Sequence, residues 1–143
     1  MSVLVNYQVG LRYQSLPGLG LQPAVEVHLY VGERDTRVVG ILDSGSLLTV
    51  FSEEIATRLG IENVAEGRPV RVTTFAGDNT FYQFAVEMAV EIEGIQNRFP
   101  TQVAFRPGPI SRNILGRSVF FPRFQIGFRD RIEELYLSLE HEP

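Results

Sequence analysis

The sequence predicts a mainly β protein, and three observations support this prediction. Apolar and polar residues alternate with a period of two over most of the chain, as in residues 25–29, which is typical of strands with one buried face. Short turn signals rich in Gly, Pro, Asp and Asn separate these segments. Only residues 52–59 combine a helical spacing of apolar residues with helix end signals. The length of 143 residues suits one domain with a single core.

The first predicted hairpin leads to an aspartate. Residues 25–29 form its first strand, residues 32–35 form its turn, and residues 38–42 form a more continuously apolar, buried second strand. The hairpin therefore places Asp43 at the end of a buried strand.

The predicted helix runs from Ser52 to about Leu59. Ser52 is the expected N-cap, two glutamates occupy the first turn, where the helix dipole favours negative charge, and Gly60 is the expected stop. Ile55 and Leu59 lie four residues apart, so we expect both to pack against the sheet beside the Asp43 loop.

The remaining elements follow from the same signals. Strands at 70–74 and 81–86 flank a glycine-bearing tip and predict a second hairpin. Pro122 limits residues 118–124 to a short helical segment, and residues 129–134 predict a charged turn. Further strands are expected at 84–92, 99–105, 124–128 and 135–139.

The composition excludes several classes of function. The 17 acidic and 13 basic residues are interspersed, so no basic block predicts nucleic-acid binding. Every basic residue is Arg, which excludes a lysine Schiff base, and the absence of Cys excludes thiol catalysis. His28 and His141 lack a third ligand spaced for a metal, so both are expected to be solvated, and neither a metal nor a cofactor is expected. The N-terminus lacks a signal-peptide pattern and no apolar run reaches roughly 18 residues, so we expect a cytoplasmic protein with no membrane partner.

An aspartate at the end of a buried strand requires an explanation. Asp is a poor strand residue, and its carboxylate is costly to bury unless it is paired or hydrogen-bonded. Gly45 lets the main chain approach the carboxylate of Asp43, and the hydroxyls of Ser44 and Ser46 can donate hydrogen bonds. An ordinary Asp-Ser-Gly turn is the plain alternative. No Gly-x-Ser-x-Gly motif is present to support a Ser-His-Asp triad.

Four features occur in one order along the chain: the buried strand that ends in Asp43-Ser44-Gly45-Ser46, the helix, the glycine hairpin with Ala76-Gly77-Asp78, and Ile114-Leu115-Gly116-Arg117. Over about residues 20–139, this order resembles the retropepsin-like aspartic peptidases, including their bacterial single-domain members. The resemblance implies a single-domain closed β-barrel of the retropepsin type over residues 21–143. One short helix would follow the Asp-Ser-Gly loop, a short helical segment would lie near the C-terminus, and residues 1–20 would be an N-terminal extension or strand.

The resemblance also assigns roles to individual residues. It implies that Asp43 is the catalytic carboxylate, that Ser44 braces two active-site loops across a dimer, and that Gly45 presents an amide to the carboxylate. Ser46 is expected to hydrogen-bond Asp43 and to contact substrate. Apolar substrate residues are expected around the cleaved bond. The other implied substrate-binding residues are Leu47, Phe75, Ala76, Gly77, Asp78, Phe81 and Ile114.

The implied activity is that of an aspartic endopeptidase that cleaves polypeptides as a homodimer. The sequence holds a single Asp-Ser-Gly, so a second copy must supply the second carboxylate. Leu135, Leu137 and Leu139 alternate, which suits either a strand shared between subunits or one that packs only on its own chain, and the shared strand is the favoured expectation. Leu47 stands where viral members carry an acid, so Arg117 has no local partner. The alternatives are a catalytically silent dimerisation module of this fold and a peptidase restricted to self-processing.

Overall fold

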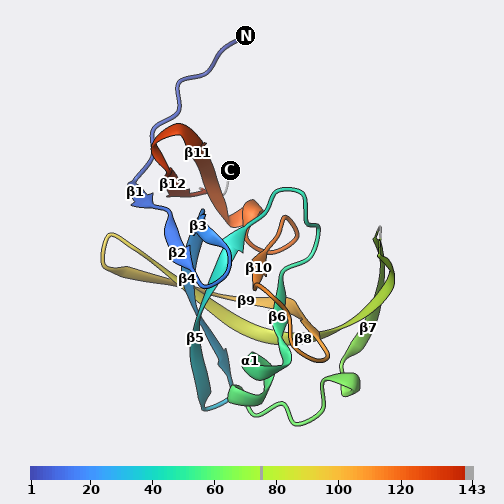
Figure 1. The fold of residues 1–143 in the computed structure, drawn as a ribbon. Coiled ribbons are helices and arrows are strands. Elements are labelled where there is room, and N and C mark those ends of the chain that lie inside the picture. Colours follow the sequence, from blue (N-terminus) through green and yellow to red (C-terminus); the bar gives the residue numbers. More distant parts are fainter. Residues whose placement is uncertain (75, 141–143) are drawn as a thin grey trace.

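The computed structural model describes residues 1–74 and 76–140 (Figure 1). The helical elements are α1 (Glu53–Arg58) and three 3₁₀ segments, η1 (Val64–Glu66), η2 (Phe121–Arg123) and η3 (Asp130–Ile132). The strands are β1 (Val9–Arg12), β2 (Gln14–Leu16), β3 (Gly20–Gln22), β4 (Ala24–Val31), β5 (Arg34–Leu42), β6 (Val50–Ser52), β7 (Arg68–Thr74), β8 (Gly77–Ile92), β9 (Ile95–Arg106), β10 (Ile114–Leu115), β11 (Phe124–Arg129) and β12 (Glu134–Leu139). The prediction of a mainly β protein with one short α-helix is therefore confirmed for the described residues.

Seven strands form the main sheet, in the order β4-β5-β10-β6-β9-β8-β7. Strand β4 also pairs with β8, through His28 to Tyr30 opposite Glu87 to Ala89, so the strand pairings lead from β4 through five neighbours and back to β4. Strand β7 pairs with β8 beyond this circuit. The β7–β8 hairpin consequently extends away from the body of the sheet, as Figure 1 shows.

The chain termini meet in a separate three-stranded sheet of order β1-β12-β11. Strand β12 pairs with β1 on one side and with β11 on the other, and Leu135 and Leu137 are fully buried in the core of their own chain. The expectation that this leucine strand is shared between subunits is therefore wrong, because both of its edges are occupied. The edges that this sheet leaves unpaired belong to β1 and β11.

Alternation of buried and exposed residues along the strands builds one hydrophobic core. In β4, Val25, Val27 and Leu29 point into this core, whereas Glu26 is exposed and His28 is only partly buried. Ile55 and Leu59 of the helical segment join the same core, as their spacing predicted. The largest fully buried side chains include Phe51, Phe105, Phe120, Met88 and Leu115.

The helix begins and ends close to its predicted limits. Ser52 is the N-cap and Gly60 follows the helix with a φ of 82°, but the Ser52 side chain makes no capping hydrogen bond. The two glutamates of the first turn complement the helix dipole instead. One of them, Glu53, also accepts a hydrogen bond from the Gly108 amide at 2.7 Å, which ties the proline-rich loop after β9 to the helix.

His28 differs from its prediction. Its side chain is only 14% exposed, and its ring lies between two partners: Nε2 is 2.8 Å from Asp35 Oδ1, and Nδ1 is 2.8 Å from the Tyr30 hydroxyl. The expectation of a solvated His28 is therefore wrong, because the neighbouring strand supplies a carboxylate. His141 lies outside the described residues. In the described part of the chain, no helix has the length and hydropathy needed to cross a membrane.

Candidate active site

The loop that follows β5 holds Asp43 in a half-buried position with its main chain fixed. The Asp43 amide donates to the Leu115 carbonyl at 3.1 Å, and the Ser46 amide donates back to the Asp43 carbonyl at 3.2 Å. The Gly45 amide donates to Asp43 Oδ1 at 2.8 Å, which is the contact expected from the sequence. This hydrogen bond from a main-chain amide orients the carboxylate.

A second apolar segment, strand β10, lies beside the strand that ends at Asp43. Strand β10 pairs in parallel with the end of β5, with Ile114 opposite Ile41 and Leu115 opposite Leu42. The segment that ends at Asp43 and the segment that ends at Gly116 therefore lie next to each other. After β10, the Arg117 amide donates to the Ser46 carbonyl at 2.9 Å, so the loop is held at both its ends.

Gly116 sits where a side chain has no room. A β-carbon built at this position would lie 2.2 Å from the Leu48 carbonyl oxygen and 2.7 Å from that of Ser46. Its amide donates to the buried Thr49 hydroxyl at 2.9 Å. The apolar-apolar-Gly motif is thus a packing requirement, because the chain after β10 must pass in contact with the main chain of the Asp43 loop.

Within one chain, neither serine of the loop makes the contact expected of it. The Ser46 hydroxyl donates to the Leu48 carbonyl at 2.8 Å, within the loop, so the hydrogen bond expected from Ser46 to Asp43 is wrong for this structure. Ser44 is exposed, and its hydroxyl has no hydrogen-bond partner among the described residues. The role expected for Ser44 concerns a second subunit and stays a prediction.

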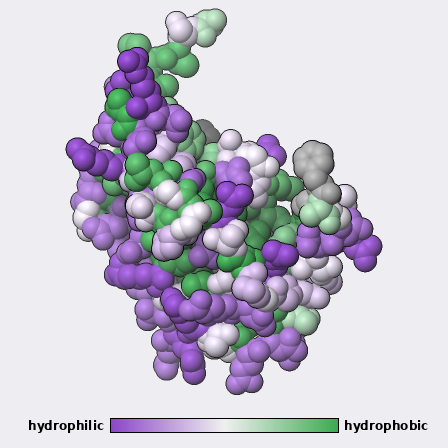
Figure 2. Space-filling view, in the orientation of Figure 1, coloured by the Kyte–Doolittle hydropathy of each residue, from purple (hydrophilic) through white to green (hydrophobic). Residues whose placement is uncertain are grey.

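Asp43 borders a groove of about 720 Å³ that lies between its own loop and the β7–β8 hairpin. Figure 2 shows apolar side chains gathered near the middle of the face on which β10 lies in Figure 1, with polar residues on both sides. Of the residues expected at the site, the groove brings together Asp43, Gly45, Ser46, Leu47, Phe81 and Ile114. The sequence did not single out Leu48, Val50, Val70, Arg71, Val72, Thr73, Arg106, Ile110, Ser111, Arg112 and Arg117 as residues lining one groove with Asp43.

The described residues of the hairpin tip, Ala76, Gly77 and Asp78, are not among those that line this groove. Asp78 faces Thr73 across the hairpin and accepts a hydrogen bond from its hydroxyl at 2.6 Å. Ala76 is a turn residue beside it, and Gly77, with a φ of 107°, begins β8. Phe75, also expected to bind substrate, lies outside the described residues. Phe81, which pairs with Val70 nearer the body of the sheet, is the hairpin residue from the prediction that does line the groove.

The arginines are the main feature that sequence reasoning missed. Four of the thirteen arginines line the groove, whereas Asp43 is its one acidic residue among those described. For Arg117 the sequence held one indication of an unpaired charge, because Leu47, which is 62% exposed, stands in place of its expected acidic partner. The others come from β7, the end of β9 and the loop after it, and no local pattern predicts that they converge. The four are Arg71, Arg106, Arg112 and Arg117.

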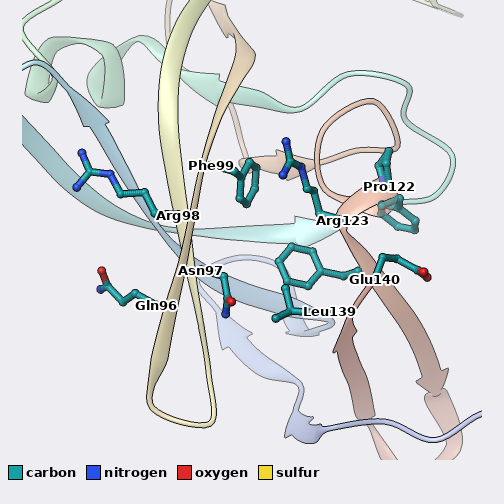
Figure 3. Close-up of a pocket in the computed structure, with 10 residues that line it drawn as sticks. Gln96, Asn97, Arg98, Phe99, Pro122, Arg123, Leu139 and Glu140 are labelled. Carbon is teal, nitrogen blue, oxygen red and sulfur yellow. The ribbon is translucent and has the colours of Figure 1, made fainter. Parts of the chain in front are cut away.

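A larger cavity, of about 970 Å³, lies elsewhere on the molecule (Figure 3). It is formed by β9, η2 and the end of β12, and the Arg123 guanidinium stacks 4.4 Å from the Phe99 ring centre within it. Asp43 is not among its lining residues. Among the described residues, no cluster of three or more His, Cys, Asp or Glu side chains is placed to hold a metal ion. The Asp43 groove combines a fixed carboxylate with apolar lining residues, and for this reason it is the candidate active site.

Comparison with known proteins gives a family and a fold. Residues 27–119 match the sequence profile of a family described as aspartyl protease. Among solved structures, a retropepsin-like aspartic protease from Rickettsia conorii matches with a TM-score of 0.60 and 16% identity, over 91% of this chain and 98% of that one. EIAV protease, in complex with the inhibitor HBY-793, matches with a TM-score of 0.44 and 21% identity, over 75% of this chain and 92% of that one. Comparison with curated proteins found no match.

Proposed function

This chain belongs to the aspartyl protease family and has a retropepsin-like fold, and on that premise we propose that it cleaves peptide bonds as a homodimer with Asp43 of each chain in one active site. The observation that carries the proposal is the Asp43 carboxylate, which the Gly45 amide orients at the edge of a groove. A rigid, hydrogen-bonded loop that presents a carboxylate to an open groove suits acid–base chemistry. A structural turn would not need that groove.

The need for two chains follows from the chemistry. Hydrolysis requires one group that removes a proton from water and another that donates a proton to the peptide, and the sequence has a single Asp-Ser-Gly. A two-fold axis brings the same loop from each chain together, which builds a symmetric site from a short sequence. The exposed position of Ser44 leaves its hydroxyl available to the partner's loop in such an arrangement.

In the proposed reaction, the two Asp43 carboxyl groups hold one proton between them, because two like charges a few ångströms apart cannot both form cheaply. The ionised carboxylate takes a proton from water as the oxygen attacks the peptide carbonyl, and the protonated one gives its proton to the carbonyl oxygen. Collapse of the resulting tetrahedral intermediate breaks the C–N bond: the carboxyl group that took the water proton gives it to the leaving amine, and the other carboxyl group takes back the proton that it gave to the carbonyl oxygen. Each carboxyl group thus acts once as a base and once as an acid.

The β7–β8 hairpin supports this proposal as the wall that covers bound substrate. It projects beyond the strand circuit, and its apolar residues Val70, Val72 and Phe81 line the groove opposite the Asp43 loop. Closure of such a hairpin over an extended peptide would exclude water and add strand-like main-chain contacts. Apolar substrate residues would lie against Leu48, Ile114 and the hairpin.

The test compares the wild-type chain with Asp43→Asn, a change that keeps the shape of the side chain and removes its acid–base function. We expect the wild type to sediment as a dimer and to cleave members of a mixed peptide library between pH 3 and 8. We expect Asp43→Asn to fold and to dimerise but to leave every peptide intact, as read by mass spectrometry. Asp35→Asn, on the far end of β5, is the matched control and should cleave like the wild type.

Two outcomes would replace the proposal. A stable monomer that is inert at every pH would favour a silent interaction module. Cleavage of its own chain alone, abolished in Asp43→Asn, would favour a self-processing peptidase. Cleavage by Asp43→Asn at the wild-type rate would exclude the paired-aspartate mechanism.

A further inference from the structure

We propose that Arg106, Arg112 and Arg117 make this groove selective for acidic polypeptide substrates, with carboxylates on both sides of the cleaved bond. The inference rests on the peptidase function proposed above and adds the substrate class. It also extends the expectation of apolar substrate residues around the cleaved bond: apolar residues of the substrate would lie at the centre, and acidic residues would flank them.

The three arginines reach the groove from different segments. Arg106 ends β9 beside Ser52 of β6, Arg112 lies in the loop between β9 and β10, and Arg117 follows β10. The main chain of Arg117 is fixed to the Asp43 loop through its hydrogen bond to the Ser46 carbonyl. All three side chains are exposed and line the groove that Asp43 borders.

These arginines have no acidic partner in the described part of the chain. The described ion pairs formed by arginines lie elsewhere and join Arg37 to Glu26, Arg58 to Glu54, and Arg98 to Glu87. The groove therefore concentrates unpaired positive charge in a chain whose formal net charge is −4. A concave surface lined by one sign of charge attracts ligands of the opposite sign more strongly than a flat surface does.

Arg71 also borders the groove, from the hairpin side, where it lies in β7 between the groove residues Val70 and Val72. Because it lines the groove, it cannot serve as a control. Arg68 lies in the same strand and is exposed, and among the described residues it neither lines the groove nor forms an ion pair. Arg68 therefore provides the matched control.

The shape of the groove favours an extended polypeptide over a nucleic acid. Its floor and walls are aliphatic, with Leu48, Val50 and Ile110 among them, and Phe81 is its one aromatic residue among those described. Nucleic-acid grooves rely on several aromatic stacking platforms. Guanidinium groups bind carboxylates through two parallel hydrogen bonds, and a two-fold axis would place each arginine on both sides of the active site. Acidic residues are thus expected on both sides of the cleaved bond.

The experiment uses matched peptides in which one Glu, or its uncharged counterpart Gln, is moved through the positions that flank a central apolar pair. For the wild-type chain, we expect kcat/KM to be about tenfold higher for the Glu peptide at the sensitive positions, and the ratio should shrink as salt is raised. The triple variant Arg106→Gln, Arg112→Gln, Arg117→Gln should bring the Glu-to-Gln ratio close to one. Arg68→Gln should keep the wild-type ratio, and Arg117→Glu should favour peptides that carry Arg at the same positions.

A binding measurement separates this inference from the proposed function. Fluorescein-labelled Glu and Gln peptides are titrated with Asp43→Asn and with Asp43→Asn that also carries the three Arg→Gln changes, and anisotropy gives the dissociation constants. If the wild type cleaves no peptide, the peptidase proposal fails, but tighter binding of the Glu peptide that depends on the three arginines would still support the acidic ligand.

Four results would overturn the inference. The first is equal kcat/KM and equal affinity for the Glu and Gln peptides, and the second is a Glu preference that survives in the triple variant. The third is a triple variant that loses only dimerisation, which would assign the arginines to subunit contacts. The fourth is displacement of the Glu peptide by a single-stranded oligonucleotide of the same length at a lower concentration, which would assign the groove to nucleic acid.

Discussion

The buried Thr49 hydroxyl accepts a hydrogen bond from the Gly116 amide at 2.9 Å, and this bond joins the end of the Asp43 loop to the segment after β10. Thr49 is only 1% exposed, so neither group can turn to water if the bond is lost. The carbonyl of Thr49 is also engaged, since it accepts a hydrogen bond from the Ala104 amide at 2.9 Å. The position of Asp43 therefore depends on a polar contact inside the core.

Thr49→Val should lower the free energy of unfolding by about 1–3 kcal/mol, because it leaves the buried Gly116 amide without an acceptor while conserving side-chain shape. Urea denaturation followed by circular dichroism measures this change. Thr57→Val, which removes an exposed hydroxyl bonded to the Glu53 carbonyl, should change stability by no more than about 0.5 kcal/mol. Equal losses in the two variants would show that the Thr49 bond has no special importance.

Gly116→Ala should destabilise the fold by about 1–3 kcal/mol or more, because its new β-carbon would meet the Leu48 carbonyl and main-chain atoms cannot move aside as a side chain can. Any cleavage activity should fall with it, since the Asp43 loop would be displaced. Gly10→Ala is the control: its β-carbon would lie 3.2 Å from the movable Tyr136 ring. A thermal melt of Gly116→Ala that matched the wild type would contradict the close contact.

The raised pKa of Tyr13 predicts that the free energy of unfolding falls at high pH. Burial raises the pKa of Tyr13 above its usual value of about 10, and the nearby carboxylates of Asp130 and Glu133 raise it further. The folded chain therefore holds this proton more tightly than the unfolded chain. The stabilising contribution is fully present below the unfolded pKa and is lost as the pH rises from there through the folded pKa.

Tyr13→Phe should remove this part of the pH dependence, and Asp130→Asn should reduce it. Urea denaturation at a series of pH values from neutral to alkaline measures the slope for each variant. A wild-type slope that persists unchanged in Tyr13→Phe would assign the alkaline loss to other groups.

Deleting residues 1–12 should lower the free energy of unfolding by about 2 kcal/mol or more, because several main-chain hydrogen bonds worth about 1 kcal/mol each are lost. Strand β1 pairs with β12, the Gln8 amide donates to Ser138 Oγ at 2.7 Å, and the Tyr7 ring packs against Tyr136. Deleting only residues 1–4, whose apolar side chains are exposed, should have little effect. If both deletions were equally mild, the N-terminal strand would be dispensable for the fold.

Local patterns in the sequence were sufficient to predict the longer strands and the helix, but not the short strands β1, β2, β3 and β6. Alternation identified the hairpin of β4 and β5, and the serine and glycine signals located the helix between Ser52 and Gly60. What could not be predicted was the long-range order of strands, including the return of β8 to β4.

The candidate site was predictable where its residues are adjacent in the chain and unpredictable where they are not. Gly45 and Asp43 lie two residues apart, so their hydrogen bond follows from local geometry. The Ser46 hydroxyl donates to the Leu48 carbonyl, because a nearby main-chain carbonyl competes with the Asp43 carboxylate as an acceptor. The convergence of Arg106, Arg112 and Arg117 depends on how β9 and β10 are placed by the sheet, and sequence spacing carries no such information.

The strand pairings that lead back to β4 predict two rates of amide hydrogen exchange with solvent, one for the paired circuit and one for β7. Strands β4, β5, β10, β6, β9 and β8 are each paired on both sides along part of their length, so opening any one of them breaks two ladders, whereas β7 is paired on one side only. Exchange through local opening should therefore be slow at Asp43 and fast along β7. With this difference, local opening of the β7–β8 hairpin would let substrate enter and leave while the Asp43 carboxylate stays fixed.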